Sequence, residues 1–368
     1  MAPRVIPFLD LKRRHAALAA AAEEALVRVA RSGQYVLGPA LAEFETAFAQ
    51  RLGDGHGVGV ASGTDALSLA LLALGVGAGD EVITVANVCM PVAAAIRAVG
   101  ARLVLADCGR ESRLLETDEL SRRLGPRTRA VIAPHLYGHL VDGPALAAVC
   151  SERGIRLVED CAQAHGARLL GREAGSWADL ATFSFYPTKN LGAYGDGGLV
   201  YTRSAEHAGR LRLLRMYGYE RRDWSVLEGR NSRLDEIQAA LLRVQLDCLD
   251  AWVARRRTIA ARYITELNGL PGLGLPVERA GAEGAYHLFV VTVEDRDAVR
   301  QRLSSLGVAT GVHYPAALHE HPVYAGAGLG SFPNAEWLSP RVLSLPCYPE
   351  LEDDEVTQVI AAVRQVLA

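Results

Sequence analysis

Lysine is rare in this chain, and one of its two lysines lies in a segment whose residues could carry chemistry. Lys12 lies near the start and Lys189 lies within Phe183–Gly198; removing these two from 39 basic residues leaves 37 arginines. A neutral amine can form an imine or move a proton, whereas arginine stays protonated and is not nucleophilic. The segment predicts an amine with a chemical task, and the alternative is a leftover lysine on a solvated loop.

A second segment, Val60–Leu67, joins the end of a predicted strand to the start of a helix. A turn at Ser62 and Gly63 precedes a helix that begins near Thr64. Free N–H groups and the helix dipole at such a start favour an anion such as phosphate. The alternative is simple N-capping by Ser62 or Thr64. The glycine spacing from Gly57 onward does not fit a dinucleotide-binding turn.

A third segment, Leu157–His165, places polar residues directly after an apolar run. A carboxylate at Asp160 can hydrogen-bond a protonated pyridine nitrogen, and Gln163 could face a hydroxyl group on the same ring. In the Lys189 segment, Ser184 can donate to a phosphate, and the glycines allow close backbone approach. The alternatives are that Asp160 caps the next helix and that the glycine-rich stretch is a hairpin.

The three segments together indicate one cofactor. A phosphate-type helix start, a strand-end acid and a lysine 29 residues after that acid are the layout of a pyridoxal 5′-phosphate enzyme. In such an enzyme the lysine forms a Schiff base and the acid partners the pyridinium nitrogen.

The pattern from about residue 55 to 205 predicts the scaffold that would position these groups. Strand starts recur roughly every 21 to 27 residues, which is typical of βαβ units and a mostly parallel sheet. Such a sheet binds ligands beyond the carboxyl ends of its strands, where all three segments lie. The predicted strands are 57–61, 81–85, 102–106, 130–134, 156–159, 180–184, 199–202 and 287–293. The predicted helices are 8–31, 64–74, 92–99, 117–124, 144–153, 205–216, 235–262, 297–306 and 354–367.

Length and composition indicate a soluble protein of two domains. A chain of 368 residues is too long for one ordinary core. We predict a large cofactor-binding domain at 1–250 and a small C-terminal domain at 251–368. A net charge of −3 gives no reason to expect nucleic acid or an anionic membrane as a partner.

Cysteine usage predicts a cytoplasmic protein without a bound metal. The six cysteines form no C-x-x-C pair and fit neither a zinc site nor a disulfide framework, so they are expected to be reduced thiols. No apolar run reaches the ~20 residues of a membrane span. The first ten residues lack the long apolar core of a signal peptide.

These motifs resemble the DegT/DnrJ/EryC1/StrS family of sugar aminotransferases, and the likeness runs from Pro7 to the C-terminus. It implies the aspartate-aminotransferase fold (fold type I), an α/β fold whose large domain has a mostly parallel mixed sheet beside a smaller C-terminal α/β domain. The segments that carry the resemblance are Ser62–Leu67, Gly79–Ile83, His135–Gly138, Glu159–Gly166, Phe183–Gly192, Asn231–Ala239 and Gly311–Pro315.

The resemblance implies how the cofactor is bound. Lys189 would hold pyridoxal phosphate as an internal aldimine, Asp160 would pair with its ring nitrogen, and Gln163 would contact the ring hydroxyl. The phosphate would be bound by Gly63, Thr64 and Ser184.

The resemblance also implies a homodimer with the active site at the subunit interface. Asn231 would reach the phosphate from the partner subunit. His313 and Tyr314 would lie near the path of the nucleotide sugar, as would Tyr217 and Tyr35.

The chain departs from the family where an aromatic residue usually stacks on the cofactor ring. The alignment puts Cys89 at that position, so the ring face must pack against a non-aromatic group such as Cys89 or Met90.

The implied reaction has two halves. L-Glutamate gives its amino group to the cofactor, leaving 2-oxoglutarate and pyridoxamine 5′-phosphate, and a nucleotide-linked keto-sugar then takes the amine. The runs Gly195–Gly198 and Gln163–Gly166 resemble the branch that aminates 3-keto sugars, which favours a TDP-linked 3-keto-deoxyhexose in deoxyamino-sugar or antibiotic biosynthesis.

Several alternatives remain open. The acceptor could be a 4-keto sugar or a carbocyclic ketone. Other classes are a nicotinamide-dependent sugar oxidoreductase, which the glycine spacing does not support, and a cofactor-binding regulator without turnover. The presence of Lys189 argues against the sister enzymes of the family that carry histidine there and remove a sugar hydroxyl.

Overall fold

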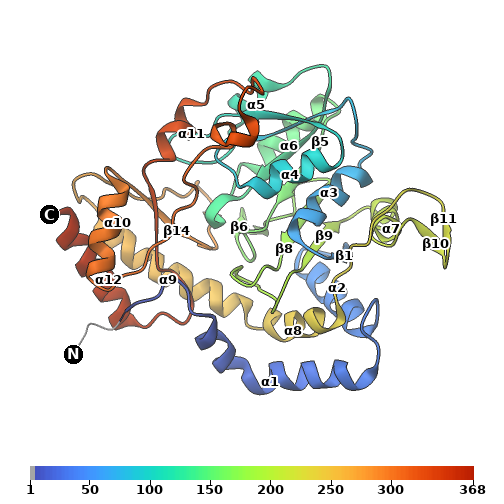
Figure 1. Ribbon diagram of the computed structural model, residues 1–368, viewed down its shortest axis with the longest axis horizontal. Helices are drawn as coiled ribbons and strands as arrows, with labels where there is room; N and C mark the ends of the chain where they lie inside the picture. The colour runs from blue at the N-terminus through green and yellow to red at the C-terminus, as the bar shows by residue number, and fades with distance from the viewer. Residues whose placement is uncertain (1–4) are drawn as a thin grey trace.

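A seven-stranded sheet forms the centre of the computed structural model, which describes residues 5–368 (Figure 1). Residues 1–4, which belong to the predicted large domain and to the start searched for a signal peptide, lie outside that range. The strand order is β1-β9-β8-β5-β4-β2-β3. Only β9 is reversed, since it is antiparallel to both of its neighbours while the other pairs are parallel. The strands are β1 (His56–Val60), β2 (Glu81–Val85), β3 (Arg102–Ala106), β4 (Thr128–Pro134), β5 (Arg156–Asp160), β8 (Leu180–Ser184) and β9 (Gly198–Thr202).

The seven strands predicted for this sheet are confirmed to within two residues at each end. Both faces of the sheet are covered, so its inner strands are near-continuous buried runs: every residue of β8 and β9 is buried. The helices that follow the strands are α3 (Gly63–Ala73), α4 (Met90–Ala98), α5 (Thr117–Arg123), α6 (Gly143–Glu152) and α7 (Ala205–Leu214).

A smaller antiparallel sheet, ordered β12-β14-β15, forms a second core beside the first. Its strands are β12 (Leu273–Gly274), β14 (Phe289–Val293) and β15 (Val342–Leu345), and its helices are α9 (Leu249–Leu267), α10 (Arg296–Ser305) and α12 (Asp353–Leu367). Tyr263, Phe289 and Ile360 are buried in this core.

The prediction of one long helix over 235–262 is wrong. The structure has α8 (Glu236–Leu246) and α9, with a break at Asp247 and Cys248. Both helices contribute to one core, through Leu242 of α8 and Val253 of α9. Ala240 of α8 also packs on Ala25 and Val29 of α1 (Leu11–Ser32), whereas α9 continues into the second core. The chain changes direction between the two helices (Figure 1).

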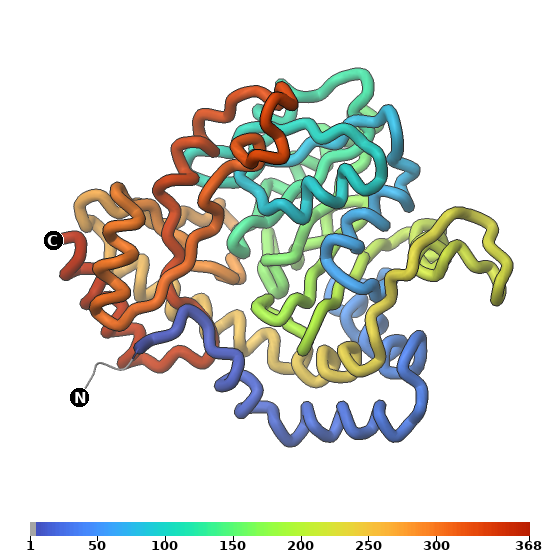
Figure 2. Tube along the Cα trace, in the orientation of Figure 1, coloured from blue at the N-terminus to red at the C-terminus, as the bar shows by residue number. Residues whose placement is uncertain are grey.

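Two segments cross the predicted domain boundary at residue 250, and the division at this residue stays a prediction. Near the N-terminus, Ile6 forms a parallel bridge with Val308, so the blue start of the chain lies beside the orange C-terminal region (Figure 2). In the other direction, α11 (Pro333–Leu338) packs on the first core, and Asp107 accepts hydrogen bonds from the N–H groups of Asn334 and Ala335.

The remaining elements are short or flank the main sheet. A hairpin of β10 (Tyr219–Arg221) and β11 (Trp224–Ser225) projects from the body (Figure 2). The others are α2 (Pro39–Arg51), β6 (Arg168–Leu169), β7 (Arg172–Glu173), β13 (Ala282–Glu283), η1 (Leu136–Gly138), η2 (Leu318–Glu320) and η3 (Pro322–Tyr324). Within residues 5–368, no helix combines the length and the apolar character needed to cross a membrane.

Candidate active site

A cavity of about 420 Å³ lies at the carboxyl edge of the main sheet. It is bordered by the turn after β1, the start of α4, the ends of β5 and β8, and a C-terminal loop. Eight of the predicted site residues line it together: Gly63, Thr64, Asp160, Gln163, Ser184, Lys189, His313 and Tyr314.

One end of the cavity is the start of α3. Ser62 caps this helix by accepting a hydrogen bond from the N–H of Asp65. A Cβ atom at Gly63 would lie 2.6 Å from the Cβ of Ser184, so glycine is required for β8 to approach the turn this closely. The Ser184 hydroxyl accepts from the N–H of Tyr186 at 3.3 Å and keeps its own hydrogen to donate. Helix N–H groups beside a hydroxyl donor fit a phosphate.

Asp160 and Lys189 face the middle of the cavity. Burial raises the pKa of the Asp160 carboxyl, against the opposing effects of the Ala162 N–H, which donates to it at 3.1 Å, and the charge of Lys189. Burial lowers the pKa of the Lys189 amine, while Cys89 and Asp160 act in the other direction. A cationic ring nitrogen beside Asp160 would restore its charge, and a neutral amine at Lys189 is the form that attacks a carbonyl.

Gln163 is fixed at both ends of its amide. Its Oε1 accepts from the backbone N–H of Tyr137 at 2.6 Å, and its Nε2 donates to the hydroxyl of Tyr314 at 2.9 Å. Tyr137 in turn donates its own hydroxyl to the carbonyl of His313 at 2.9 Å. Sequence reasoning missed Tyr137, although it lies in the quoted run from His135 to Gly138.

Cys89, which was predicted to face the cofactor ring, lines the cavity. Burial, followed by the charge of Asp160, raises the pKa of its thiol, so Cys89 is an uncharged group facing the cavity. Met90 points elsewhere, since its sulfur accepts from the hydroxyl of Tyr324. Of the two residues predicted to pack against the cofactor ring, Cys89 and Met90, the geometry therefore favours Cys89.

Two histidines border the cavity on the side of the second sheet. His313 lies 2.8 Å from the hydroxyl of Ser344 through Nδ1 and stacks on Phe8; burial and the charge of Lys189 lower its pKa to about 4. His287, which sequence reasoning missed, lies 3.3 Å from Oδ1 of Asn190. Its pKa is also lowered by burial and by Lys189, so both rings are neutral at pH 7.

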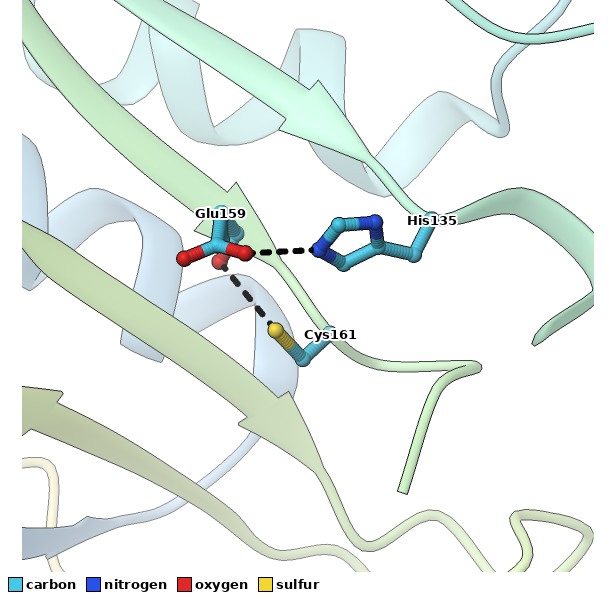
Figure 3. Close-up of side chains that lie close together, drawn as sticks. All are labelled: His135, Glu159 and Cys161. Atoms are coloured by element: carbon cyan, nitrogen blue, oxygen red, sulfur yellow. Dashed lines mark hydrogen bonds and ion pairs between the residues drawn. The ribbon is translucent and has the colours of Figure 1, made fainter. Parts of the chain in front are cut away.

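Glu159 lies on the face of β5 opposite Asp160, is wholly buried and points toward His135 (Figure 3). Its carboxylate lies 3.0 Å from Nε2 of His135 and accepts from the backbone N–H groups of Gly175, Trp177 and Ala178. Burial opposes its ionisation, yet the hydrogen bond and charge of His135 and these N–H groups leave its pKa below the ordinary value. The carboxylate therefore anchors loops behind the cavity.

Tyr35, Tyr217 and Asn231 do not line this cavity in the described single chain. Tyr35 is 52% exposed and donates its hydroxyl to the carbonyl of Ala30, and Tyr217 is 40% exposed beside Tyr219. Asn231 is exposed as well. Their roles at the site stay predictions.

Comparison with known proteins decides the family. A model of the DegT/DnrJ/EryC1/StrS aminotransferase family matches residues 17–364. The chain belongs to this family. Among its relatives, the dTDP-3-amino-3,4,6-trideoxy-alpha-D-glucose transaminase of Streptomyces venezuelae is 47% identical over 365 residues, which are 99% of this chain and 96% of the relative.

Solved structures of the family agree with the fold. DesV of S. venezuelae in complex with a ketimine intermediate superposes with a TM-score of 0.97 at 46% identity, covering 99% of this chain and 98% of that one. NtdA of Bacillus subtilis with bound cofactor PMP gives a TM-score of 0.93 at 28% identity, covering 100% and 86%. The predictions of fold type I, of an aminotransferase and of pyridoxal phosphate as cofactor are confirmed.

Proposed function

We propose that this enzyme transfers the amino group of L-glutamate to C3 of a TDP-linked 3-keto-deoxyhexose, in deoxyamino-sugar biosynthesis. The observation that carries the proposal is the 47% identity, over nearly the whole length of both chains, to a transaminase named for a dTDP-3-amino sugar. The cavity described above supports it, because it offers an anion-binding helix start, a strand-end acid and a lysine amine together.

The residues of the chain would divide the work as follows. Gly63, Thr64 and Ser184 would bind the phosphate of the cofactor, and Asp160 would accept a hydrogen bond from its protonated ring nitrogen. When bound, pyridoxal phosphate supplies a ring that accepts electrons from the reacting carbon. Nζ of Lys189 would remove the proton from Cα of glutamate and hold it during transfer, which requires the neutral amine that burial favours.

The acceptor is tested by supplying candidate ketones to the purified enzyme with glutamate. We expect turnover of a TDP-3-keto-deoxyhexose, with the new C–N bond at C3 in the NMR spectrum of the product and one 2-oxoglutarate formed for each amine. Amination at C4 of a 4-keto sugar, or turnover of a carbocyclic ketone alone, would replace the proposed substrate and leave the aminotransferase assignment intact.

We further propose a homodimer in which Asn231 serves the site of the partner subunit. Its exposure, and that of Tyr35 and Tyr217, supports contacts made outside their own chain. Mixing inactive Lys189→Ala and Asn231→Ala variants tests this, because a mixed dimer holds one site with both residues intact. About a quarter of wild-type activity is expected after random exchange. No recovery despite exchange would place Asn231 in the site of its own chain, and full activity of Asn231→Ala alone would show that it serves neither site.

A cytoplasmic location is proposed as well, with the six free cysteines as its support.

A further inference from the structure

A buried arginine from the N-terminal helix reaches the backbone of the proposed catalytic lysine. Arg14 lies in the first turn of α1 and is only 3% exposed. Its Nη1 donates to the carbonyl oxygen of Lys189 at 3.1 Å, across 175 residues of sequence. The contact lies on the main chain of Lys189 and leaves the side-chain amine in the cavity.

The guanidinium of Arg14 is itself held from two further directions. Its Nε pairs with Oε1 of Glu350 at 3.4 Å, and its Cζ lies 5.2 Å from the ring centroid of Trp252 on α9. Its Nη2 is buried without a partner. A planar guanidinium group can hydrogen-bond to two groups while it stacks on an aromatic ring, whereas the ammonium group of lysine cannot.

Other hydrogen bonds hold the backbone and the neighbour of Lys189 in place. The N–H of Lys189 donates to the carbonyl of Tyr186 at 2.8 Å. The amide of Asn190 donates to the carbonyl of Ala285 at 3.0 Å. The carbonyl of Lys189 is the remaining peptide group at this residue, and Arg14 is its hydrogen-bond partner.

We propose that Arg14 is a positioning residue that holds the peptide of Lys189 and thereby sets where its Nζ lies in the cavity. The inference rests on the proposed role of Lys189. Loss of the contact would let the peptide rotate and shift an amine that must meet a reacting carbon. Misplacing a reacting group by about 1 Å can cost on the order of 100-fold in rate.

The neighbouring Arg13 provides a matched control. It also ties α1 to the C-terminal segment, by donating to both carboxylate oxygens of Glu355 and to the backbone carbonyl of Glu350 at 3.2 Å. No hydrogen bond among the described residues joins Arg13 to Lys189. Comparing Arg13→Ala with Arg14→Ala therefore separates attachment of α1 from positioning of the lysine.

The test measures the pre-steady-state reaction of the holoenzyme with glutamate, its KM, and the visible absorption and dissociation constant of pyridoxal phosphate. For Arg14→Ala we expect the rate constant to fall roughly 10- to 100-fold with little change in KM, and the visible absorption to shift. Added guanidinium ion should restore part of the rate.

Arg14→Lys, which keeps the charge beside Glu350, should fold and show a smaller loss of rate. Arg13→Ala should keep the wild-type rate and spectrum while lowering the melting temperature.

Two results would overturn the proposal: wild-type rate and spectrum in Arg14→Ala and Arg14→Lys, or equal losses in the Arg13 and Arg14 variants without guanidinium rescue. Failure of the proposed function gives a different result: a wrong acceptor would leave the reaction with glutamate unchanged in the wild type, and a wrong role for Lys189 would leave turnover intact in Lys189→Ala, whatever the Arg14 variants do.

Discussion

Two adjacent carboxylates at the end of β5 have opposite surroundings. Glu159 faces the back of the strand, where it lies beside His135 (Figure 3). Three backbone N–H groups also donate to it, and its pKa is lowered. Asp160 faces the cavity, where it accepts one backbone hydrogen bond and burial raises its pKa. Successive side chains of a strand point to opposite faces, which separates the two environments.

The difference indicates that the back face is complete within the protein and the cavity face is not. The charge of Glu159 already has its donors, so it contributes to folding. The charge of Asp160 lacks a strong partner until a cation lies beside it. Changes on the cavity face should therefore affect chemistry, and changes on the back face should affect stability.

The largest expected effect lies on the cavity face. Lys189→Ala should lower transamination by at least about 10⁴-fold, because it removes both the nucleophile and the proton carrier. The melting temperature of the cofactor-free protein should not fall, because Nζ of Lys189 forms no hydrogen bond or ion pair among the described residues. Spectrophotometry of 2-oxoglutarate formation and thermal unfolding measure both. A variant that turns over at the wild-type rate would end the assignment of Lys189.

Asp160→Asn should lower the rate about 100-fold or more, because an amide cannot keep the ring nitrogen protonated. The cofactor-free variant should be as stable as the wild type or more so, since the amide avoids burying a charge. Urea unfolding and single-turnover rates check the pair of expectations. A marked loss of stability would mean that the Asp160 carboxylate stabilises the fold, as the Glu159 carboxylate does.

Glu159→Gln should reverse this pattern. The amide NH₂ would face backbone N–H donors, so we expect a loss of about 3 kcal/mol in the free energy of unfolding. The rate at a temperature where the variant is folded should fall less than in Asp160→Asn. Chemical denaturation with parallel kinetics provides the measurement, and unchanged stability would contradict the anchoring role of Glu159.

Gly63→Ala should weaken cofactor binding about tenfold, because the new methyl group would push Ser184 from the start of α3. Fluorescence titration with pyridoxal phosphate measures the dissociation constant. Gly209→Ala, within α7 and with open space around it, is the control for a glycine change outside the cavity. Equal affinities in both variants would show that Ser184 can move without consequence.

The smallest expected effect is a pair of opposite pH dependences in the cofactor-free protein. Glu159 has a pKa below its ordinary 4.5, so its stabilisation is present above that pH and is lost as pH falls through the lowered value. Asp160 has a pKa above its ordinary 3.8, so its cost appears as pH rises from 3.8 to the raised value. On acidification, Glu159→Gln should lose less stability than the wild type and Asp160→Asn should lose more. Denaturation midpoints measured across pH test this: a slope parallel to that of the wild type would mean that the group has no shift, and a reversed difference would mean that the direction is wrong.

The sheet and the cavity face were predictable because their signals are local. Each strand is a short buried run, and Thr64, Asp160 and Ser184 lie at or just beyond strand ends, which meet at one edge. A reader of the sequence needs only the strand positions to bring these residues together.

Helix α2 escaped prediction although Pro39 at its first position and apolar residues at helical spacing are local signals. Other features depend on contacts between distant segments. Helix α2 has no capping side chain of its own; Glu236 supplies the cap by accepting from the N–H groups of Gly38, Ala40 and Leu41. Arg14 acts on a residue 175 positions away. No pattern within a window of the sequence carries such information.

The two hydrogen bonds of the Gln163 amide have a consequence for ligand affinity. The side chain spans from the main sheet to the C-terminal loop and has already lost its rotational freedom in the folded chain. A ring hydroxyl that meets this amide finds it in one orientation, so the entropic cost of ordering the side chain does not weaken binding. Changing Tyr314 to phenylalanine would free one end of the amide and transfer that cost to the binding step.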